Sequence, residues 1–262
     1  MSYMIICTMA LVVSGLTLFS GFGLGTLLMP AFALFFPVEV AIAATAIVHL
    51  ANNIFKLGLV GRKANLGIVV RFALPAAIMA MTGALLLSYF ATIEPITQYT
   101  LAGRDCTVTV VKLVIAVMIM GFAFIELNPN FEKLAFNTKF IPLGGALSGF
   151  FGGLSGHQGA LRTAFLIRAG LEKDVFIGTM VVSAVVVDLS RLVIYGATFF
   201  SRDFAVLKTQ GVIELVIAGS LAAFAGAFIG SRLLKKITMR TIQILVGVML
   251  LVLAVAIGTG II

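Results

Sequence analysis

Apolar runs of about twenty residues recur in this chain from one end to the other. Three clear examples are 68–90, 211–231 and 241–262. A run of this length crosses the hydrocarbon core of a bilayer as one α-helix. Of the 262 residues, 61% are hydrophobic and only 11% are charged, so little polar surface is left to cover a soluble core. The sequence predicts an all-α integral membrane protein that forms a single transmembrane domain.

Breaks between the apolar runs divide the chain into a series of predicted helices. Their approximate bounds are 3–19, 24–36, 38–60, 68–90, 107–126, 141–154, 159–170, 174–200, 211–231 and 241–262. Two neighbouring pairs, 3–19 with 24–36 and 141–154 with 159–170, contain members too short to span the bilayer comfortably. Irregular backbone at membrane depth must be covered by protein or line a water-filled cavity. We therefore interpret each pair as a re-entrant hairpin.

The tips of both predicted hairpins are polar and rich in glycine. The first contains Ser20, Gly21, Phe22, Gly23 and Gly25, and the second contains Ser155, Gly156, His157, Gln158 and Gly159. An interrupted helix leaves backbone N–H groups free at the start of its second half, where the helix dipole is positive. Such N–H groups bind anions. The tips therefore predict an anion-binding site, although glycines also allow tight helix packing.

The two halves of the chain resemble each other at an offset of about 134 residues. Ser14 and Gly15 match Ser148 and Gly149, and Gly25 matches Gly159. With one residue of slippage, Asn53 falls on Asp188 and Lys56 on Arg191. We expect a first repeat over 1–126 and a second over 140–262, joined by a cytoplasmic connector at 127–139. Each repeat has one hairpin and three spans, an odd number of crossings, so the second must be inverted.

The basic residues predict how the chain is oriented in the membrane. The net charge is +8, but most of the basic residues lie in short connections between helices, so we expect no nucleic-acid partner. One face would collect Arg62, Lys63, Lys133, Lys139, Arg168, Lys173, Arg232, Lys235, Lys236 and Arg240, and the other mainly Arg104, Arg202 and Lys208. Since basic residues favour the cytoplasmic side, the first face is cytoplasmic and both termini are outside.

Charged and polar residues inside the predicted spans are the other candidates for the site. Arg162 follows the second tip by one helical turn and must face a partner, a cavity or a substrate. Its partner is either an anion or a carboxylate, Asp188 or Glu39. Further residues within spans are predicted to line the same cavity: Asn52, Asn53, Lys56, Asp188, Ser190 and Arg191. Lys56 and Arg191 are alternatively placed to extend toward the membrane surface.

Three residues are candidates for carrying a proton coupled to transport. His49 and His157 are the only histidines, and imidazole titrates near neutral pH. Asp188 is the third, because a carboxyl group in a low-dielectric span can hold a proton. Histidines inside membranes also serve simply as hydrogen-bond partners between helices. Cys7 and Cys106 lie in different segments without a CxxC motif, so we expect no disulfide framework, metal or cofactor.

Two matching motifs carry a resemblance to a known family. SGLTLFSGFGLGTLLMP (14–30) and SGFFGGLSGHQGALRTAF (148–165) are each followed by a span that opens near an acidic residue. Together they resemble the TauE/SafE sulfite-exporter family, also called the toluene sulfonate uptake permease family. The resemblance covers nearly the whole chain. It implies a bacterial inner-membrane protein of inverted repeats that exports or imports sulfite, thiosulfate, sulfoacetate or another organosulfur anion.

The resemblance also assigns residues at the tips. The glycine-rich turns of the family correspond to Gly21, Gly23 and Gly25 and to Ser155, Gly156 and Gly159. The proline that often follows is Pro30, whereas the second half has Ala164 at the matching position. His157 and Gln158 also depart from the usual run of glycines. A bulkier and more polar second tip favours a different oxyanion from plain sulfite.

Three other functions compete with transport by alternating access. An anion channel would use the same tips to line a continuous pore. Gly153-Leu154-Ser155-Gly156 resembles the Gly-x-Ser-Gly of rhomboid proteases, but the only histidine after Ser155 is His157 and the chain has no tryptophan, so we expect no enzyme. A structural subunit would not need paired polar tips. The small residues Gly219, Gly226 and Gly230 suit helix packing, either within one subunit or between two subunits of a homodimer.

Overall fold

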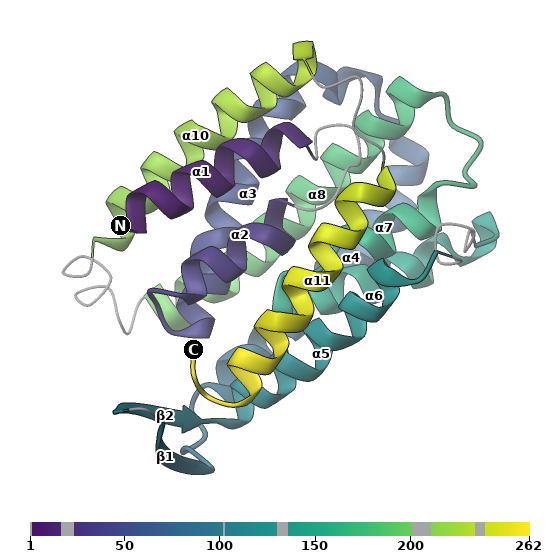
Figure 1. Cartoon of the computed structure of the whole chain (residues 1–262). Coiled ribbons are helices and arrows are strands. Elements are labelled where there is room, and N and C mark those ends of the chain that lie inside the picture. Colours follow the sequence, from purple (N-terminus) through teal and green to yellow (C-terminus); the bar gives the residue numbers. More distant parts are fainter. Residues whose placement is uncertain (1, 17–23, 102, 130–135, 201–210, 234–238) are drawn as a thin grey trace.

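The computed structural model describes residues 2–16, 24–101, 103–129, 136–200, 211–233 and 239–262. Its α-helices are α1 (Ser2–Leu16), α2 (Leu24–Ala33), α3 (Val38–Val60), α4 (Leu66–Phe90), α5 (Val110–Leu127), α6 (Ile141–Ser155), α7 (Gly159–Leu166), α8 (Lys173–Tyr195), α10 (Val212–Leu233) and α11 (Met239–Gly258). A five-residue π-helical segment, Gly196–Phe200, extends α8. Every apolar segment predicted from the sequence overlaps one of these helices, with ends that differ by a few residues (Figure 1).

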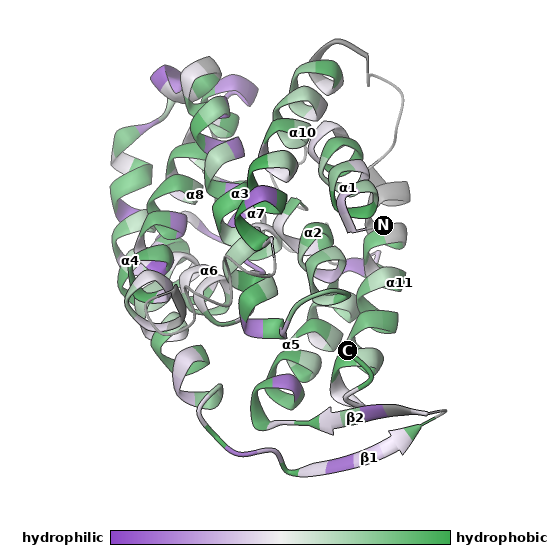
Figure 2. Cartoon of the chain, turned by 90° about the vertical axis from the view of Figure 1, so that its left-hand side faces the viewer, coloured by the Kyte–Doolittle hydropathy of each residue, from purple (hydrophilic) through white to green (hydrophobic). Residues whose placement is uncertain are grey.

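Among the described residues, five helices are long and apolar enough to cross a membrane: α3, α4, α5, α8 and α10. Shorter apolar helices lie at Ser2–Gly15, Leu24–Ala33 and Val246–Gly258. Large apolar side chains such as Leu74, Ile78 and Leu85 point outward from α4, and Figure 2 shows hydrophobic residues along most of the helices. An apolar outer surface of this extent requires lipid as its solvent. The protein is therefore an α-helical, multi-pass membrane protein.

Local sequence signals explain several helix boundaries. Asn65 precedes α4, and its side chain accepts a hydrogen bond of 3.1 Å from the Ile68 N–H. Thr109 precedes α5 and accepts one of 3.2 Å from the Lys112 N–H. These side chains satisfy N–H groups that a helix start leaves without an intrahelical partner.

A short β-hairpin between α4 and α5 was not predicted. Strand β1 (Thr97–Leu101) pairs antiparallel with β2 (Arg104–Val108), and Gly103 in the turn has a φ of 78°. The Tyr99 hydroxyl donates to the Thr259 carbonyl, which ties the hairpin to the C-terminal end of α11. Both strands are short and mostly polar, and β1 is exposed along its length, so neither produces an apolar run in the sequence. As a result, α5 begins at Val110, three residues after the predicted start.

The two chain ends and the hairpin lie at the same end of the helix bundle (Figure 1). A pocket at this end is lined by Phe36, Ala91, Thr109 and the C-terminal Ile262, and a second pocket that shares Phe36 is lined by Ser2 and Gly211. The short 3-10 helix Gly61–Lys63 lies at the opposite end, where Lys63 forms an exposed 2.5 Å ion pair with Asp174. The bundle thus has one end with both termini and one with basic connections.

Glycines bring α6 into backbone contact with α4. A methyl group on Gly145, Gly149 or Gly153 would lie only 2.0–2.1 Å from a carbonyl oxygen of α4. The oxygens belong, in the same order, to Phe72, Ala76 and Ala80. The two helices therefore run in the same direction and touch over successive turns, as small residues permit inside membranes.

A second parallel pair joins α10 to α1, which Figure 1 shows side by side. A methyl group on Gly226 would lie 2.0 Å from the Leu11 carbonyl oxygen, and one on Gly230 would lie 2.5 Å from that of Gly15. A methyl group on Gly219 would make ordinary contacts with Ile6 and Val48. Of the two arrangements left open by the sequence, these glycines pack within one chain.

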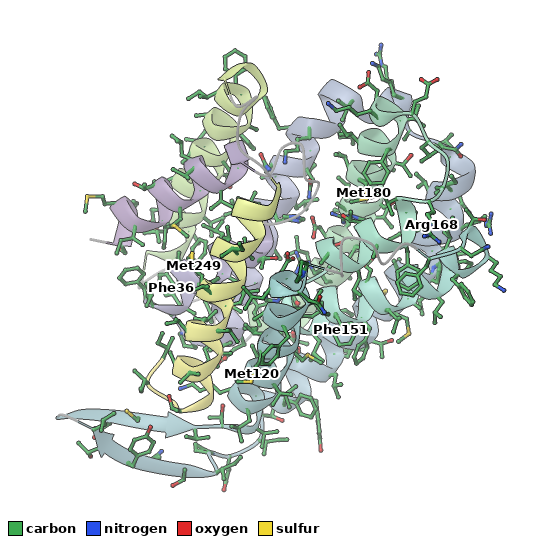
Figure 3. All side chains as sticks on the ribbon, turned by 45° about the vertical axis from the view of Figure 1, so that its right-hand side comes forward. Phe36, Met120, Phe151, Arg168, Met180 and Met249 are labelled. Atoms are coloured by element: carbon green, nitrogen blue, oxygen red, sulfur yellow. The ribbon has the colours of Figure 1, made fainter. Side chains whose placement is uncertain are left out.

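The apolar side chains form two core clusters. The larger runs through α1, α2, α3, α5, α10 and α11 and includes Phe36, with Met120, Phe151 and Met249 packed against it. The smaller lies between α4, α6, α7 and α8 and includes Met180. Figure 3 labels these residues, together with the exposed Arg168 near the end of the bundle opposite the hairpin. Polar residues are buried between these two cores.

Candidate functional site

The second predicted tip is a sharp break between α6 and α7. Helix α6 ends at Ser155, Gly156 follows with a φ of 84°, and α7 begins at Gly159. This left-handed conformation is accessible to glycine without a steric penalty. The Ser148 hydroxyl of α6 donates to the Gln158 carbonyl at 2.8 Å and so fixes the tip against its own hairpin. All the predicted residues of this tip are buried.

The first predicted tip is described only from Leu24 onward. Ser20, Gly21, Phe22 and Gly23 lie outside the described residues. Gly25, at the start of α2, is buried, and a methyl group on it would lie 3.5 Å from the Gly156 carbonyl oxygen and 3.6 Å from the His49 ring. The start of α2 therefore meets the break between α6 and α7 beside the middle of α3.

Asp188 of α8 is the centre of a hydrogen-bonded network at this meeting point. Its Oδ1 accepts hydrogen bonds from Gln158 Nε2 at 2.8 Å and from Arg191 Nη2 and Nε at 2.7 and 3.1 Å. Its Oδ2 is hydrogen-bonded to His49 Nδ1 at 2.7 Å and accepts from Asn53 Nδ2 at 3.2 Å. The Asp188 side chain is fully buried, as a paired and hydrogen-bonded charge can be.

Arg191 and Arg162 connect this carboxylate to the tip. Arg191 Nη1 donates to the Gly152 carbonyl at 2.9 Å, so its guanidinium lies between Asp188 and the end of α6. Arg162 Nη1 donates to Gln158 Oε1 at 3.0 Å. The salt bridge to Asp188 thus comes from Arg191, and Arg162 reaches this carboxylate through Gln158. Both arginines are only 1% exposed, so neither extends to the membrane surface.

Two polar groups near the tips have unused hydrogen-bonding capacity. Asn52 accepts a hydrogen bond of 3.2 Å from the Ser14 hydroxyl, but its Nδ2 has no partner among the described residues. His157 Nδ1 bonds to the Ser155 carbonyl at 2.9 Å, and its ring stacks on Phe122 at 5.3 Å, while its Nε2 likewise has no described partner. A buried amide or imidazole nitrogen without a partner is costly unless a ligand or water satisfies it.

Buried cations outnumber buried carboxylates in the described part of the chain. Lys56, Arg162 and Arg191 are buried, against Asp188 and Glu126. Lys56 lies one helical turn after Asn52 on α3. Charges at such depth require compensation. The arrangement is therefore suited to hold an anion.

Some predicted residues stand apart from this network, and some members were not predicted. Ser190 donates to the Val186 carbonyl of its own helix. Ser155 donates to the Phe151 carbonyl, and its contact with His157 runs through its backbone oxygen rather than its hydroxyl. Phe122 and Tyr195, whose hydroxyl donates to the Gly153 carbonyl, were missed. An aromatic residue in an apolar span gives no sequence signal for such a role.

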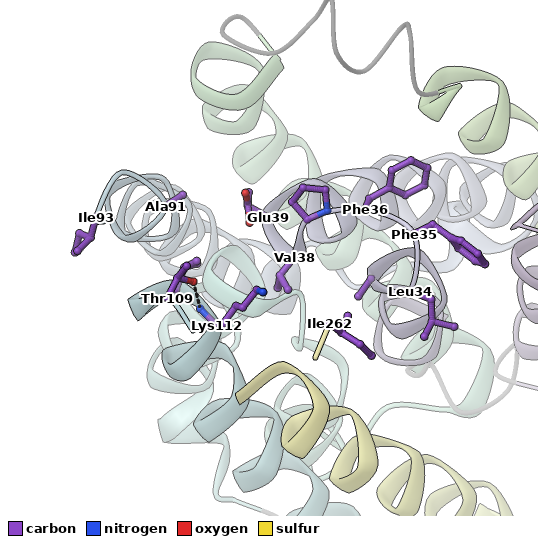
Figure 4. Close-up of a pocket in the computed structure, with 13 residues that line it drawn as sticks. Leu34, Phe35, Phe36, Val38, Glu39, Ala91, Ile93, Thr109, Lys112 and Ile262 are labelled. Atoms are coloured by element: carbon purple, nitrogen blue, oxygen red, sulfur yellow. Dashed lines mark hydrogen bonds between the residues drawn. The ribbon is translucent and has the colours of Figure 1, made fainter. Parts of the chain in front are cut away.

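A pocket of about 380 Å³ opens at the end of the bundle that carries both termini. Figure 4 shows Glu39 and Val38 on one side of it, Thr109 and Lys112 on another, and Ile262 below. Lys112 and Thr109 make it partly polar, and Lys112 also donates to the Thr107 carbonyl. No residue of the Asp188 network lines this pocket, so it is separate from the site at the tips.

A family model described as Sulfite exporter TauE/SafE matches residues 5–257 of the chain. The match includes both tips, the Asp188 network and the residues between them. No curated protein and no solved structure matches the chain.

Proposed function

This chain belongs to the sulfite exporter TauE/SafE family, and on this premise we propose that it carries sulfite or a related organosulfur anion by alternating access. The family is one of membrane transporters, not of enzymes. We further propose that the anion, such as thiosulfate, sulfoacetate or another sulfonate, binds between the two tips near the bilayer midplane. The proposed ligands are Asn52, Gln158, His157, Arg162 and Arg191, with the backbone of both tips.

The excess of buried positive charge is the observation that carries the proposal. Two of the buried cations, Arg162 and Arg191, lie in the network of one carboxylate, Asp188, and Lys56 is a third buried cation on α3. Isolated charges are strongly disfavoured in a low-dielectric interior. An anion bound at the tips would restore the balance, and it would accept a hydrogen bond from the unused N–H of the Asn52 amide.

The helix starts support the same position for the anion. Helices α2 and α7 both begin in the interior, and their starts meet where Gly25 approaches Gly156. N–H groups at the start of a helix attract anions, and discontinuous helices in transporters use them in this way. The unsubstituted glycines at this contact leave room for a ligand to approach the backbone.

The packing supports inverted repeats over 1–126 and 140–262, with a cytoplasmic connector at 127–139. The first helix of each half packs in parallel against the fourth helix of the other: α1 against α10, and α6 against α4. A two-fold relation between the halves produces this exchange of partners. In an inverted pair the two re-entrant hairpins approach the midplane from opposite sides, which suits a site that opens alternately to either face.

The distribution of basic residues supports a plasma-membrane orientation with both termini outside. The described residues Arg62, Lys63, Lys139 and Arg168 lie in connections at the end opposite the termini. By the positive-inside rule this end is cytoplasmic, and we assign the chain to the bacterial inner membrane.

Because Gly226 and Gly230 pack inside one chain, no described feature calls for a homodimer, and a single chain forms the proposed site.

Ligand-induced thermal stabilisation of the purified protein tests the substrate class. A ligand of the native state present at about 100 times its Kd adds about 2.7 kcal/mol to stability. We expect a rise in melting temperature with sulfite, thiosulfate or sulfoacetate but not with chloride. Arg162→Gln should abolish this rise, whereas Arg168→Gln, which changes an exposed arginine farther along the same segment, should retain it. A shift that survives Arg162→Gln would place the anion elsewhere.

Counterflow in proteoliposomes separates a carrier from a channel. A carrier preloaded with unlabelled anion should accumulate labelled anion transiently, because exchange is faster than net flow. A channel with the same fold would show conductance without this overshoot. Absence of both exchange and conductance for every anion tested would reject transport of this substrate class.

A further inference from the structure

Asp188 presents its two oxygens to different parts of the structure. Oδ2 faces α3, where His49 lies 2.7 Å and Asn53 3.2 Å away. Oδ1 faces the second tip and accepts from Gln158 and Arg191. The same carboxylate thus links an imidazole on one side to the proposed anion-binding groups on the other.

Asp188 and a bound anion compete for Arg191. Two nitrogens of this guanidinium bind the carboxylate, and the third donates to Gly152 and lies 3.6 Å from a methyl group built on Gly156. An anion at the tip would bring a second negative charge to the same guanidinium. Because like charges repel strongly in a low-dielectric site, an ionised Asp188 weakens anion binding. A proton on the Asp188–His49 pair removes this competition.

We propose that the His49–Asp188 pair takes up one proton when the anion binds, so that proton and anion cross the membrane together. The net charge of the pair then changes from −1 to 0, and both are released on the other side. By linkage, the anion favours the proton as much as the proton favours the anion. The same cycle runs outward when the anion is abundant inside. This inference rests on the proposed function, since it names the coupling ion for that site.

The groups around the pair are consistent with this linkage. Asn53 of α3, Gln158 and Arg162 of the second hairpin, and Arg191 of α8 face it, and Lys56 is buried farther along α3. The described part of α2 has no ionisable side chain, and Glu214 of α10 lies in the first turn of that helix. The surrounding cations oppose a proton while the site is empty. A bound anion offsets their charge, so proton uptake becomes easier once it has arrived.

The contacts of His157 distinguish it from His49. Its Nδ1 bonds to the Ser155 carbonyl and its ring stacks on Phe122, with no described contact to a carboxylate. His49 instead forms the shortest side-chain contact that Asp188 makes with α3. Of the two histidines, His49 is therefore the one placed to exchange a proton with Asp188.

Thiosulfate uptake into proteoliposomes tests the coupling. Thiosulfate keeps its charge near neutral pH, so it carries no proton itself, unlike sulfite; sulfoacetate serves as a second probe. Counterflow at equal pH on both sides tests transport alone. With the membrane potential clamped at zero, a gradient of about one pH unit, alkaline inside, should drive about tenfold accumulation at one proton per anion.

His49→Gln is the decisive variant, because glutamine can still donate to Asp188 but does not titrate. We expect it to retain counterflow and lose the accumulation, which falls to a ratio near one. His157→Gln should still accumulate thiosulfate in response to the pH gradient, even if this variant transports it more slowly. If His49→Gln loses counterflow altogether, the coupling is tested in wild-type vesicles with a pH-sensitive dye. Thiosulfate that flows down its own gradient must then carry protons across the membrane in the same direction as the thiosulfate.

Each contrary result is distinct. Wild-type counterflow without pH-driven accumulation overturns the coupling and leaves the proposed function intact. Accumulation by His49→Gln equal to that of the wild type overturns the assignment of the titrating group to His49. Absence of counterflow for both probes and for sulfite rejects the proposed function and this inference with it.

Discussion

Asp188 is hydrogen-bonded to two residues of α3, to Arg191 of its own helix and to the tip residue Gln158, which makes it the most connected of the described side chains at the site. The sequence predicts that Asn53, Asp188 and Arg191 line one cavity, because charged and polar residues inside spans avoid lipid. It makes His49 a candidate proton carrier, together with Asp188. The structure brings them together within hydrogen-bonding distance. Their role as ligands of an anion or a proton remains a prediction.

The pairing within the network could not be read from the sequence. Arg162 and Arg191 were both available as partners of Asp188, and Gln158 gave no sign that it would bridge between Arg162 and the carboxylate. Which cation reaches which carboxylate depends on how α7 and α8 are rotated about their axes. Periodicity fixes the buried face of a helix but not these contacts between helices.

The Asp188–Arg191 pair predicts strongly non-additive effects on stability. Arg191→Gln leaves a buried carboxylate without its main cation, which typically costs about 3–5 kcal/mol. The double variant Asp188→Asn, Arg191→Gln should recover part of this loss, with a coupling energy of at least about 1 kcal/mol. Denaturant unfolding in mild detergent measures Asp188→Asn, Arg191→Gln and the double variant.

The exposed ion pair Lys63–Asp174 is the matched control. Its side chains are 56% and 61% exposed, so Lys63→Ala should change stability by less than about 1 kcal/mol. Additive effects at Asp188 and Arg191, or a loss at Lys63 as large as that at Arg191, would contradict this account of the buried pair.

At the level of helices, the sequence predicted helix bounds best where a glycine interrupts or ends a long apolar run. The break at Gly156 lies within the predicted second tip, since a helix in the membrane is interrupted where a left-handed residue is tolerated. The end of α7 at Leu166 was predicted at 170, because the apolar character of the sequence continues past the last helical hydrogen bonds. The hairpin β1–β2 was missed for the opposite reason, since it is too polar to stand out.

The glycines of α6 predict a test of helix packing. Gly149→Ala would place a methyl group 2.0 Å from the Ala76 carbonyl oxygen, so α6 and α4 must separate. We expect a clear fall in melting temperature or a failure to yield folded protein. Gly121→Ala on α5 is the control, because its added methyl group meets nothing within 4 Å. Alanine has the higher helix propensity, so this variant should be as stable as the wild type or more so.

For the whole molecule, the proposed orientation predicts which sites are reachable from outside the cell. In a background with Cys7→Ala and Cys106→Val, Gln98→Cys places a thiol on the exposed hairpin and Arg168→Cys places one at the opposite end. A membrane-impermeant maleimide should label Gln98→Cys in intact cells. It should label Arg168→Cys only after permeabilisation. The reverse labelling pattern would show that the chain has the opposite orientation in the membrane, with the same fold.

The exchange of partners between the halves also bears on how the protein is made. Helix α1 leaves the ribosome long before α10, which is the helix that fits its backbone at Leu11 and Gly15. Until then α1 has only lipid or the insertion machinery to contact. Assembly of the first half must therefore wait for the second, and a chain halted between the halves would present an unfinished groove to the quality-control proteases of its membrane.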